Sequence, residues 1–418
     1  MRLSGILIAA ALASRLAAQT PFSWQQIVDK FEATNPTLKA NKLNIDESRA
    51  AEITAYLRPN PDFSVTADGF QVSSNNGIFR PVSGVVITPG ISYLHEREHK
   101  RELRRDQAKE NTAIAETTYL DQRRGLLFNL QSAFVNVLQA KAVLQNATEN
   151  LNYWDRELGV FRERLKAGDL AQVDLDRLEL QRVQFESDFE TAFGNLRTAK
   201  VQILMLLNDR TPIERFDVTG KFDFNDELKP LEVYRQMALT ARPDLQVAVE
   251  NVQLAKVTHA LTVSNGSTDP TFSVWYSYNP SFSNPSADQT VGGSISIPLR
   301  IFDRNQGEKA RTQVDISRNE KLRDAAEAQV LNDVDTAYWN LVQNVNLLKP
   351  YKARYLQLAS QVRERVAFAY QNGGASLLDY LDAEKAYRDT RLAYVGLIGN
   401  YLGAVAQMDM AAGREVIR

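Results

Sequence analysis

The chain has 418 residues, a formal net charge of −2, 24% charged residues and no cysteine. The near-neutral net charge gives no overall electrostatic field that points to nucleic acid as a partner. The lack of cysteine excludes disulfides, a thiolate nucleophile and a cysteine-based metal site. A length of 418 residues is typical of two or three globular domains. An internal repeat instead predicts a single structure built from two similar halves.

The N-terminus, residues 1–18, has the pattern of an export signal. Arg2 supplies positive charge, residues 3–12 supply an apolar core, and small residues precede Gln19. An ordinary apolar helix is the alternative. Because no cysteine follows the cleavage point, we expect an exported protein that is not lipidated. No later apolar run of about 18 residues predicts a spanning helix, so insertion of the mature chain into a membrane must be by β-strands.

Sequence motifs of the first half recur in the second half at a nearly constant separation. The corresponding residues are Pro61 and Pro270, Ala133 and Ala337, and Gly168 and Gly373. This recurrence indicates a duplicated unit. We therefore expect a first repeat over residues 19–208, a linker over 209–230 and a second repeat over 231–418.

Each repeat contains two segments in which apolar and polar residues alternate with period two, as in β-strands with two unlike faces. In the third segment, for example, Phe272, Val274 and Tyr276 share one face. The alternation of the first segment slips near Gly69, which predicts a β-bulge there. The four predicted strands cover residues 61–73, 84–95, 270–279 and 290–302.

These strands have the length that a tilted strand needs to cross a hydrocarbon layer. A soluble hairpin sheet is the alternative, since half-buried strands alternate in the same way. Four strands cannot close into a barrel, and a sheet with open edges is not viable in lipid. If the strands lie in a membrane, they must therefore belong to a barrel that several subunits share.

Two very long helices follow the strands of each repeat. From Leu126 to Leu165 the apolar residues step by four and three, which is the seam of a coiled coil. A helix of about 70 residues would be about 105 Å long, far beyond the length of ordinary globular helices. A cytosolic coiled-coil rod is the alternative, but a rod needs neither the signal nor the strands. The predicted helices cover residues 97–166, 172–208, 306–371 and 376–412.

This order of elements resembles the TolC-type outer-membrane efflux proteins over nearly the whole mature chain. The local signature is a glycine turn between the long helices followed by an aspartate, at Gly168 to Asp174 and at Gly373 to Asp379. The resemblance implies a mainly α-helical homotrimer with a coiled-coil tunnel across the periplasm and a shared twelve-stranded β-barrel in outer membrane lipid. Residues 209–230 would form an equatorial belt.

The function that this resemblance implies is export, without catalysis and without a cofactor. The protein would be the passive channel of a tripartite system, docked through a periplasmic adaptor protein on an inner-membrane efflux pump. The chain is similar to the branch that serves heavy-metal cation pumps, with drugs and secreted peptides as the alternative substrates.

The resemblance also assigns residues to a pore gate. The family's constriction matches Asp379 and Asp382, which share a helix face at i, i+3 and would repel one another and attract cations in a trimer. A solvated acidic patch at a helix start is the alternative. Asp174 and Tyr370 match two positions of the family's closed-state latch, whereas the expected latch arginine is replaced by Ala375.

The two glycine turns match the places where adaptors dock in the family. The docking residues that this implies are Gly168, Asp169, Leu170, Ala171, Gly373, Gly374, Ala375, Ser376 and Leu377.

A competing motif lies after the second strand. His95, Glu96 and His99 satisfy the metalloprotease pattern H-E-x-x-H, in which two histidines one helical turn apart hold zinc and the glutamate activates water. The charged residues from Lys100 to Arg105 favour a charged collar where strand meets helix, with at most incidental metal binding by the histidines. A periplasmic zinc hydrolase and a non-conducting coiled-coil scaffold are the alternative functions.

Overall fold

The computed structural model describes residues 21–74, 76–279 and 288–416, so the predicted signal peptide lies outside the described residues. The chain divides into two compact units, each of which takes segments from both predicted repeats. The helical unit comprises the described parts of residues 1–41, 119–243 and 327–418, and the sheet unit comprises those of residues 42–118 and 244–326.

Helices make up most of the described chain. The helical unit contains α1 (Trp24–Thr34), α4 (Gln172–Leu206), a 3₁₀ helix (Ile213–Arg215), α5 (Leu231–Ala241), α8 (Leu356–Gln371) and α9 (Leu377–Ala412). Three helices run from one unit into the other: α2 (Pro36–Ala55), α3 (Lys100–Ala167) and α7 (Gln306–Pro350). The sheet unit holds α6 (Pro243–Asn265) and the strands β1 (Asp62–Asp68), β2 (Val86–Leu94), β3 (Thr271–Tyr278) and β4 (Gln289–Ser296).

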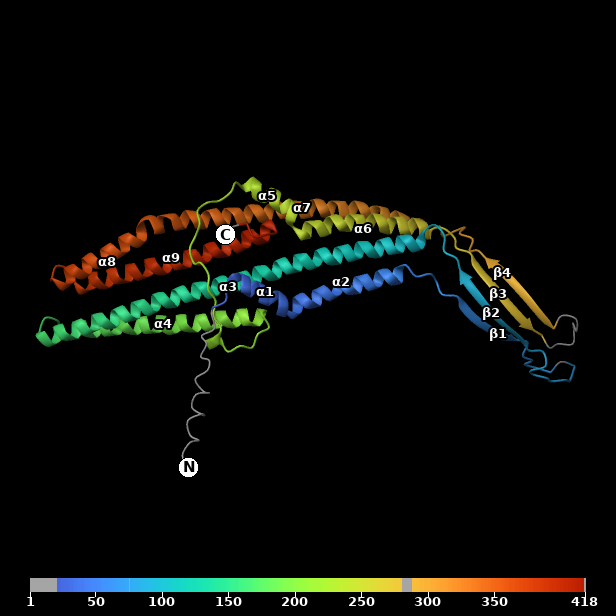
Figure 1. The fold of residues 1–418 in the computed structure, drawn as a ribbon, viewed down its shortest axis with the longest axis horizontal. Helices are drawn as coiled ribbons and strands as arrows, with labels where there is room; N and C mark the ends of the chain where they lie inside the picture. Colours follow the sequence, from blue (N-terminus) through green and yellow to red (C-terminus); the bar gives the residue numbers. More distant parts are fainter. Residues whose placement is uncertain (1–20, 75, 280–287, 417–418) are drawn as a thin grey trace, which may run out of the picture. The chain divides into compact units, whose positions relative to one another are not determined.

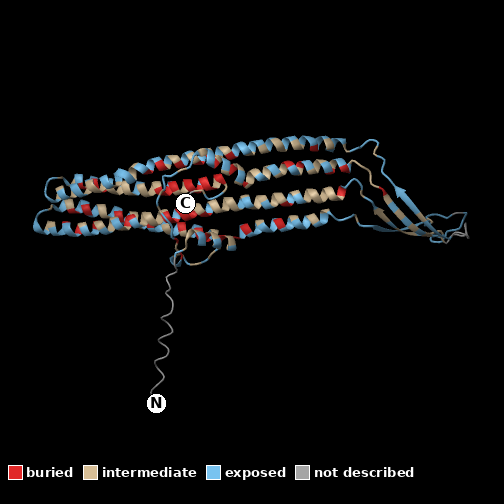
Figure 2. Ribbon diagram, turned by 45° about the horizontal axis from the view of Figure 1, so that its top comes forward, coloured by how far each residue is buried: buried red, intermediate tan, exposed pale blue. Residues whose placement is uncertain are grey.

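The coiled-coil seam is the buried stripe of α3. Its residues Leu130, Val137 and Trp154 are fully buried in the helical unit. Figure 2 shows a second concentration of buried residues along the C-terminal half of α9. The periodicity of the sequence therefore identified the packed face of the long helix. Within the described ranges, no helix combines the length and apolar character that crossing a membrane requires.

The long helix predicted over residues 306–371 is helical over its whole length but not uniform. It consists of α7, a π-helical turn at Tyr351–Tyr355, and α8. Pro350 has no amide hydrogen and its ring crowds the preceding turn, so the regular hydrogen-bond ladder is interrupted there. The Leu356 amide donates to the Tyr351 carbonyl five residues back, which is the π-helical pattern. The predicted range 306–371 is therefore helical throughout, with a change of hydrogen-bond pattern after Pro350.

The four strands form one antiparallel sheet in the order β1-β2-β3-β4 (Figure 1). The bulge predicted near Gly69 is instead the end of β1, because Gly69 adopts φ of 87° and turns the chain out of the strand. β4 likewise ends at Ser296, short of residue 302, since Pro298 cannot donate to a strand ladder.

The two faces of this sheet differ as the alternation predicts. On one face the apolar side chains are exposed: Phe272 is 44%, Val274 61% and Tyr276 39% exposed. On the opposite face the Trp275 indole lies across Gly292, where an added Cβ would be 2.5 Å from the indole Cε2. The apolar face of the sheet is thus uncovered within the described chain. On the opposite face, Gly292 leaves space for the Trp275 indole.

We predict that Gly292→Val destabilises the sheet, because its side chain would displace the Trp275 indole. Gly293→Val is the matched control, since the nearest atom to an added Cβ there is the Ser273 carbonyl oxygen at 3.5 Å. The yield of folded protein, measured by resistance to heat and protease in detergent, should fall for the first variant and stay near wild type for the second. Equal yields would contradict this packing.

Candidate functional site

Both predicted glycine turns close helices at the same end of the helical unit. Gly168 has φ of 85° and Gly373 has φ of 75°, the left-handed conformation in which glycine commonly ends a helix. After the first turn the Asp169 amide donates to the Arg164 carbonyl at 2.9 Å, and after the second the Gly374 amide donates to the Ala369 carbonyl at 2.8 Å. These bonds satisfy carbonyl groups that a helix end leaves without partners.

The start of α9 is a capping box that includes Asp379. The Ser376 amide and hydroxyl donate to Asp379 Oδ2 at 3.0 and 2.7 Å, and the Asp379 amide donates to Ser376 Oγ at 3.2 Å. Such reciprocal bonds satisfy amides at a helix start. The side-chain and backbone hydrogen bonds of Ser376 hold the pKa of Asp379 below its usual value. Asp379 therefore has a local structural role at the start of α9.

Asp382 lies one turn beyond Asp379 and is exposed like it. Among the described residues, no hydrogen bond or ion pair of the Asp382 side chain is found. Since the two aspartates are spaced i, i+3, both lie on the solvent side of α9. The structure thus leaves the Asp382 carboxylate accessible for a cation or a neighbouring chain.

The start of α4 lacks a comparable cap. Ala171 occupies the cap position and has no side-chain oxygen, and Asp174 in the first turn lies 3.7 Å from the guanidinium of Arg177. The two glycine turns therefore have the same conformation, but α4 begins without a side-chain cap and α9 begins with one.

Tyr370, the second latch candidate, is packed among aromatic rings. Its ring stacks on Tyr380 with centroids 5.2 Å apart, and Phe161 lies 5.9 Å away. Burial raises the pKa of Tyr370, with opposing effects from the charges of Arg164 and Asp174. No hydrogen bond joins Tyr370 to Asp174 within the described chain, so Asp174 acts on Tyr370 through the charge of its carboxylate.

Arg164 is a neighbour of the latch candidates that sequence reasoning missed. Its guanidinium carbon lies 5.6 Å from the centroid of the Tyr370 ring, a cation–π contact. Residue Ala375 provides no cation at the position where the resemblance expected an arginine. Arg164 places a cation beside Tyr370 from α3, and no local sequence pattern indicates that contact.

The H-E-x-x-H motif does not have the geometry of a zinc hydrolase. His95, Glu96 and Arg97 precede α3 and are not helical, and Glu98 and His99 adopt φ of 55° and 56°. The two histidines therefore do not lie one helical turn apart. Across the described ranges, no group of three histidine, cysteine or acidic side chains is arranged to hold a metal ion.

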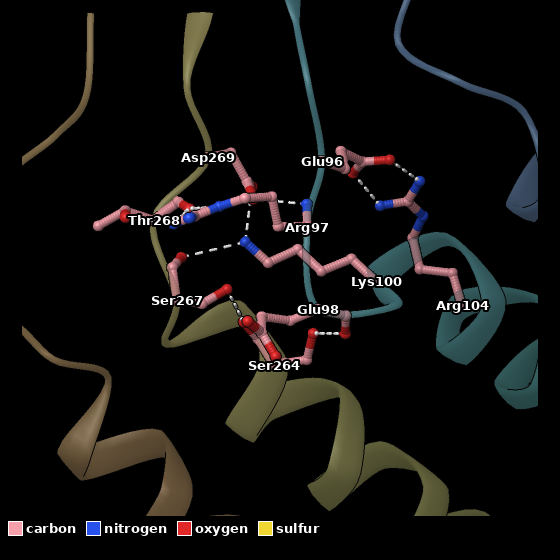
Figure 3. Close-up of polar contacts among 9 residues, drawn as sticks. All are labelled: Glu96, Arg97, Glu98, Lys100, Arg104, Ser264, Ser267, Thr268 and Asp269. Carbon is pink, nitrogen blue, oxygen red and sulfur yellow. Dashed lines mark hydrogen bonds and ion pairs between the residues drawn. The ribbon is translucent and has the colours of Figure 1, made fainter.

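The Glu96 carboxylate forms an ion pair with Arg104. Both of its oxygens contact the Arg104 guanidinium, with the Oε2 contact at 2.7 Å (Figure 3). A glutamate held in this way is not directed at a metal-bound water. The predicted charged collar describes this segment, and the zinc-hydrolase alternative is not favoured.

Figure 3 also shows how the collar connects β2 and α3 to the segment before β3. Lys100 is buried and donates to Asp269 Oδ2 at 2.6 Å and to the Ser267 carbonyl at 3.1 Å, while the Arg97 amide donates to Asp269 Oδ1 at 2.9 Å. Although burial acts to raise it, these hydrogen bonds lower the pKa of Asp269. The collar is thus a polar joint within the sheet unit.

Comparisons with known proteins agree with this architecture. The sequence profile of the family Outer membrane efflux protein matches residues 27–209 and 234–414. The cobalt-zinc-cadmium resistance protein CzcC of Cupriavidus metallidurans is 22% identical over 95% of this chain and 91% of its own length. The outer membrane protein TolC of Escherichia coli is 22% identical over 96% of this chain and 84% of its own length. The crystal structure of a membrane protein from Pseudomonas aeruginosa superposes with a TM-score of 0.78 at 14% identity, covering 96% of both chains.

We predict that Ser376→Ala loosens the first turn of α9 and raises the pKa of Asp379, because the hydroxyl that donates to its carboxylate is removed. Hydrogen exchange of the amides in this turn should become faster. Ser376→Thr, which keeps a hydroxyl, should exchange like the wild type. Unchanged protection in Ser376→Ala would show that the capping box does not hold this turn.

Proposed function

The chain belongs to the outer membrane efflux protein family, and we propose that it serves this family's export function as the passive outer membrane channel of a tripartite system. The resemblance to TolC-type proteins is confirmed by the family match and by the relatives. At the level of the family this is a transport function and not an enzymatic one. The fold of the structural neighbour supports the same architecture.

The exposed apolar face of the sheet is the observation that carries this proposal. Val274 on β3 and Val291 on β4 are 61% and 77% exposed, although burial of such side chains is favourable. β1 and β4 are the edge strands of the four-stranded sheet. In lipid the apolar face is covered by acyl chains, and pairing of edge strands between three copies gives 3 × 4 = 12 strands in a closed barrel.

The helical unit supplies the gate in this proposal. Asp379 and Asp382 lie on the exposed side of α9, and three copies would direct six carboxylates at the pore axis. These carboxylates repel one another and attract cations, as acidic rings do in cation channels. Asp174 and Tyr370 would contribute to the closed state beside them.

The proposed partners are a periplasmic adaptor and an inner-membrane pump. The adaptor would dock on the turns Gly168–Ala171 and Gly373–Leu377, most of whose residues are exposed. The protein would reach the outer membrane by a cleaved signal peptide, residues 1–18, without lipidation.

Heavy-metal cations are the substrate class that we favour. The relative CzcC is described as a cobalt-zinc-cadmium resistance protein and aligns with 95% of this chain. A carboxylate gate accepts cations more readily than anions. In this proposal the pump selects the cation and the channel conducts it passively. Metal resistance of a host lacking its own channel, restored by this chain together with its pump and adaptor, would test this assignment against drugs and peptides.

We predict a homotrimer because open strand edges are not tolerated in lipid. Native mass measurement in mild detergent should give three chains. A monomer or dimer that still conducts ions in planar bilayers would contradict the shared barrel.

We predict that replacing Asp379 and Asp382 together by alanine weakens the cation preference of the channel and its block by multivalent cations. The measurement is ion selectivity in planar bilayers at low salt, where charges are screened least. Asp389→Ala removes an exposed aspartate farther along α9 and is the matched control. If the double variant kept wild-type selectivity, the two aspartates would not form the gate.

A further inference from the structure

Glu384 is a buried carboxylate on α9 that is held from two other helices. The Tyr153 hydroxyl of α3 donates to Glu384 Oε1 at 3.1 Å, and Arg363 Nε of α8 donates to the same oxygen at 2.9 Å. The side chains of Arg363 and Glu384 are only 17% and 7% exposed. A charge at this depth is costly unless it is paired, so the three residues form one unit, the Glu384 cluster.

The arginine of the Glu384 cluster is held in place by two rings. Its guanidinium carbon lies 3.8 Å from the centroid of Tyr153 and 4.5 Å from that of Tyr387. A planar guanidinium stacks on aromatic faces and keeps its N–H groups in a fixed direction. Arg363 therefore approaches Glu384 from a defined direction and not as a mobile surface charge.

The position of α8 depends on side-chain contacts of this kind. The π-helical turn at Tyr351–Tyr355 interrupts the regular ladder between α7 and α8. Side-chain contacts therefore add to the backbone continuity with α7 in placing α8. Arg363, eight residues beyond Tyr355, joins α8 to α9 and α3 through Glu384.

Glu384 lies on the side of α9 opposite to Asp382. A helix turns about 100° per residue, so two residues apart are about 200° apart around the axis. Tyr380 and Ala383 are buried with Glu384, whereas Asp379 and Asp382 are exposed. Fixing the buried side at Glu384 therefore fixes the direction in which the two aspartates point.

The apolar contacts of α9 at this level constrain its rotation less. Tyr380 stacks on Trp154 at 6.2 Å and on Tyr370 at 5.2 Å, but shifting a ring contact costs less than uncovering a buried charge. The exposed ion pair between Arg391 and Glu149, at 3.0 Å, also joins α9 to α3, but an exposed pair contributes little. The hydrogen bonds at Glu384 are both buried and directional.

We propose that Glu384 is a positioning residue of the gate: held by Tyr153 and Arg363, it fixes the rotation of α9 that presents Asp379 and Asp382. This proposal rests on the proposed channel function. It gives Glu384 no direct contact with the transported cation. Loss of the Glu384 cluster frees α9 to rotate and frees the second turn to move.

The test is Glu384→Gln in the full-length protein, measured in planar bilayers. The substitution keeps the side-chain volume but leaves Arg363 without its buried counter-charge. The resting conductance should rise about tenfold, which corresponds to about 1.4 kcal/mol in the closed–open equilibrium. The conductance of fully open channels should match the wild type, whereas the heat resistance of the assembled protein should fall, because Arg363 stays buried without its counter-charge.

Arg363→Gln should have the same effect, and the double variant should exceed neither single one, because all three changes break one unit. Glu149→Gln is the matched control: it removes the exposed pair between the same two helices, α9 and α3, and should leave resting conductance unchanged. Tyr153→Phe removes only a hydroxyl and should act in the same direction as Glu384→Gln. If the Glu384→Gln variant does not assemble, the resting conductance of Tyr153→Phe tests the proposal instead.

Two outcomes separate the proposals. A wild-type protein that forms no channel overturns the proposed function, and the role of Glu384 with it. A conducting wild type whose Glu384→Gln or Tyr153→Phe variant keeps wild-type resting conductance, or changes no more than Glu149→Gln, overturns the positioning role alone.

Discussion

One-sided burial is the constraint on which the other features of this chain depend. Each long helix buries one stripe of its surface against other helices. The apolar face of β3 and β4 stays exposed within the described chain. The packed stripe supplies stability through apolar burial. The uncovered side is then available for solvent, lipid or other copies. For α9 this division separates a structural side with Tyr380 and Glu384 from an exposed side with Asp379 and Asp382.

Local backbone conformation and capping define where the long helices end and begin at the two glycine turns. Gly168 and Gly373 close two helices in the left-handed conformation, and Ser376 opens α9 with a capping box. These local devices determine where the helices stop but not how the helices rotate about their axes. Rotation is set by contacts across helices, of which the Glu384 cluster is the most buried ionic one at this end of the helical unit.

Buried ion pairs in this protein join different segments of the chain. Lys100 pairs with Asp269 in the sheet unit, and Arg242 pairs with Asp333 and Arg363 with Glu384 in the helical unit. A buried pair adds little net stability over an apolar contact, but breaking it leaves an uncompensated charge. Such pairs therefore favour one arrangement of the packed segments over its alternatives.

The sequence by itself determined the strands, the long helices, the glycine turns and the packed stripe of α3, because periodicity and left-handed glycines are local properties. It did not indicate that Gly69 ends β1, that Glu96 is bound to Arg104, or that Arg164 lies over Tyr370. The Glu384 cluster was decided only by the tertiary structure. Tyr153 and Glu384 are 231 residues apart, and no local pattern specifies which polar residues of two amphipathic helices meet when their apolar stripes pack.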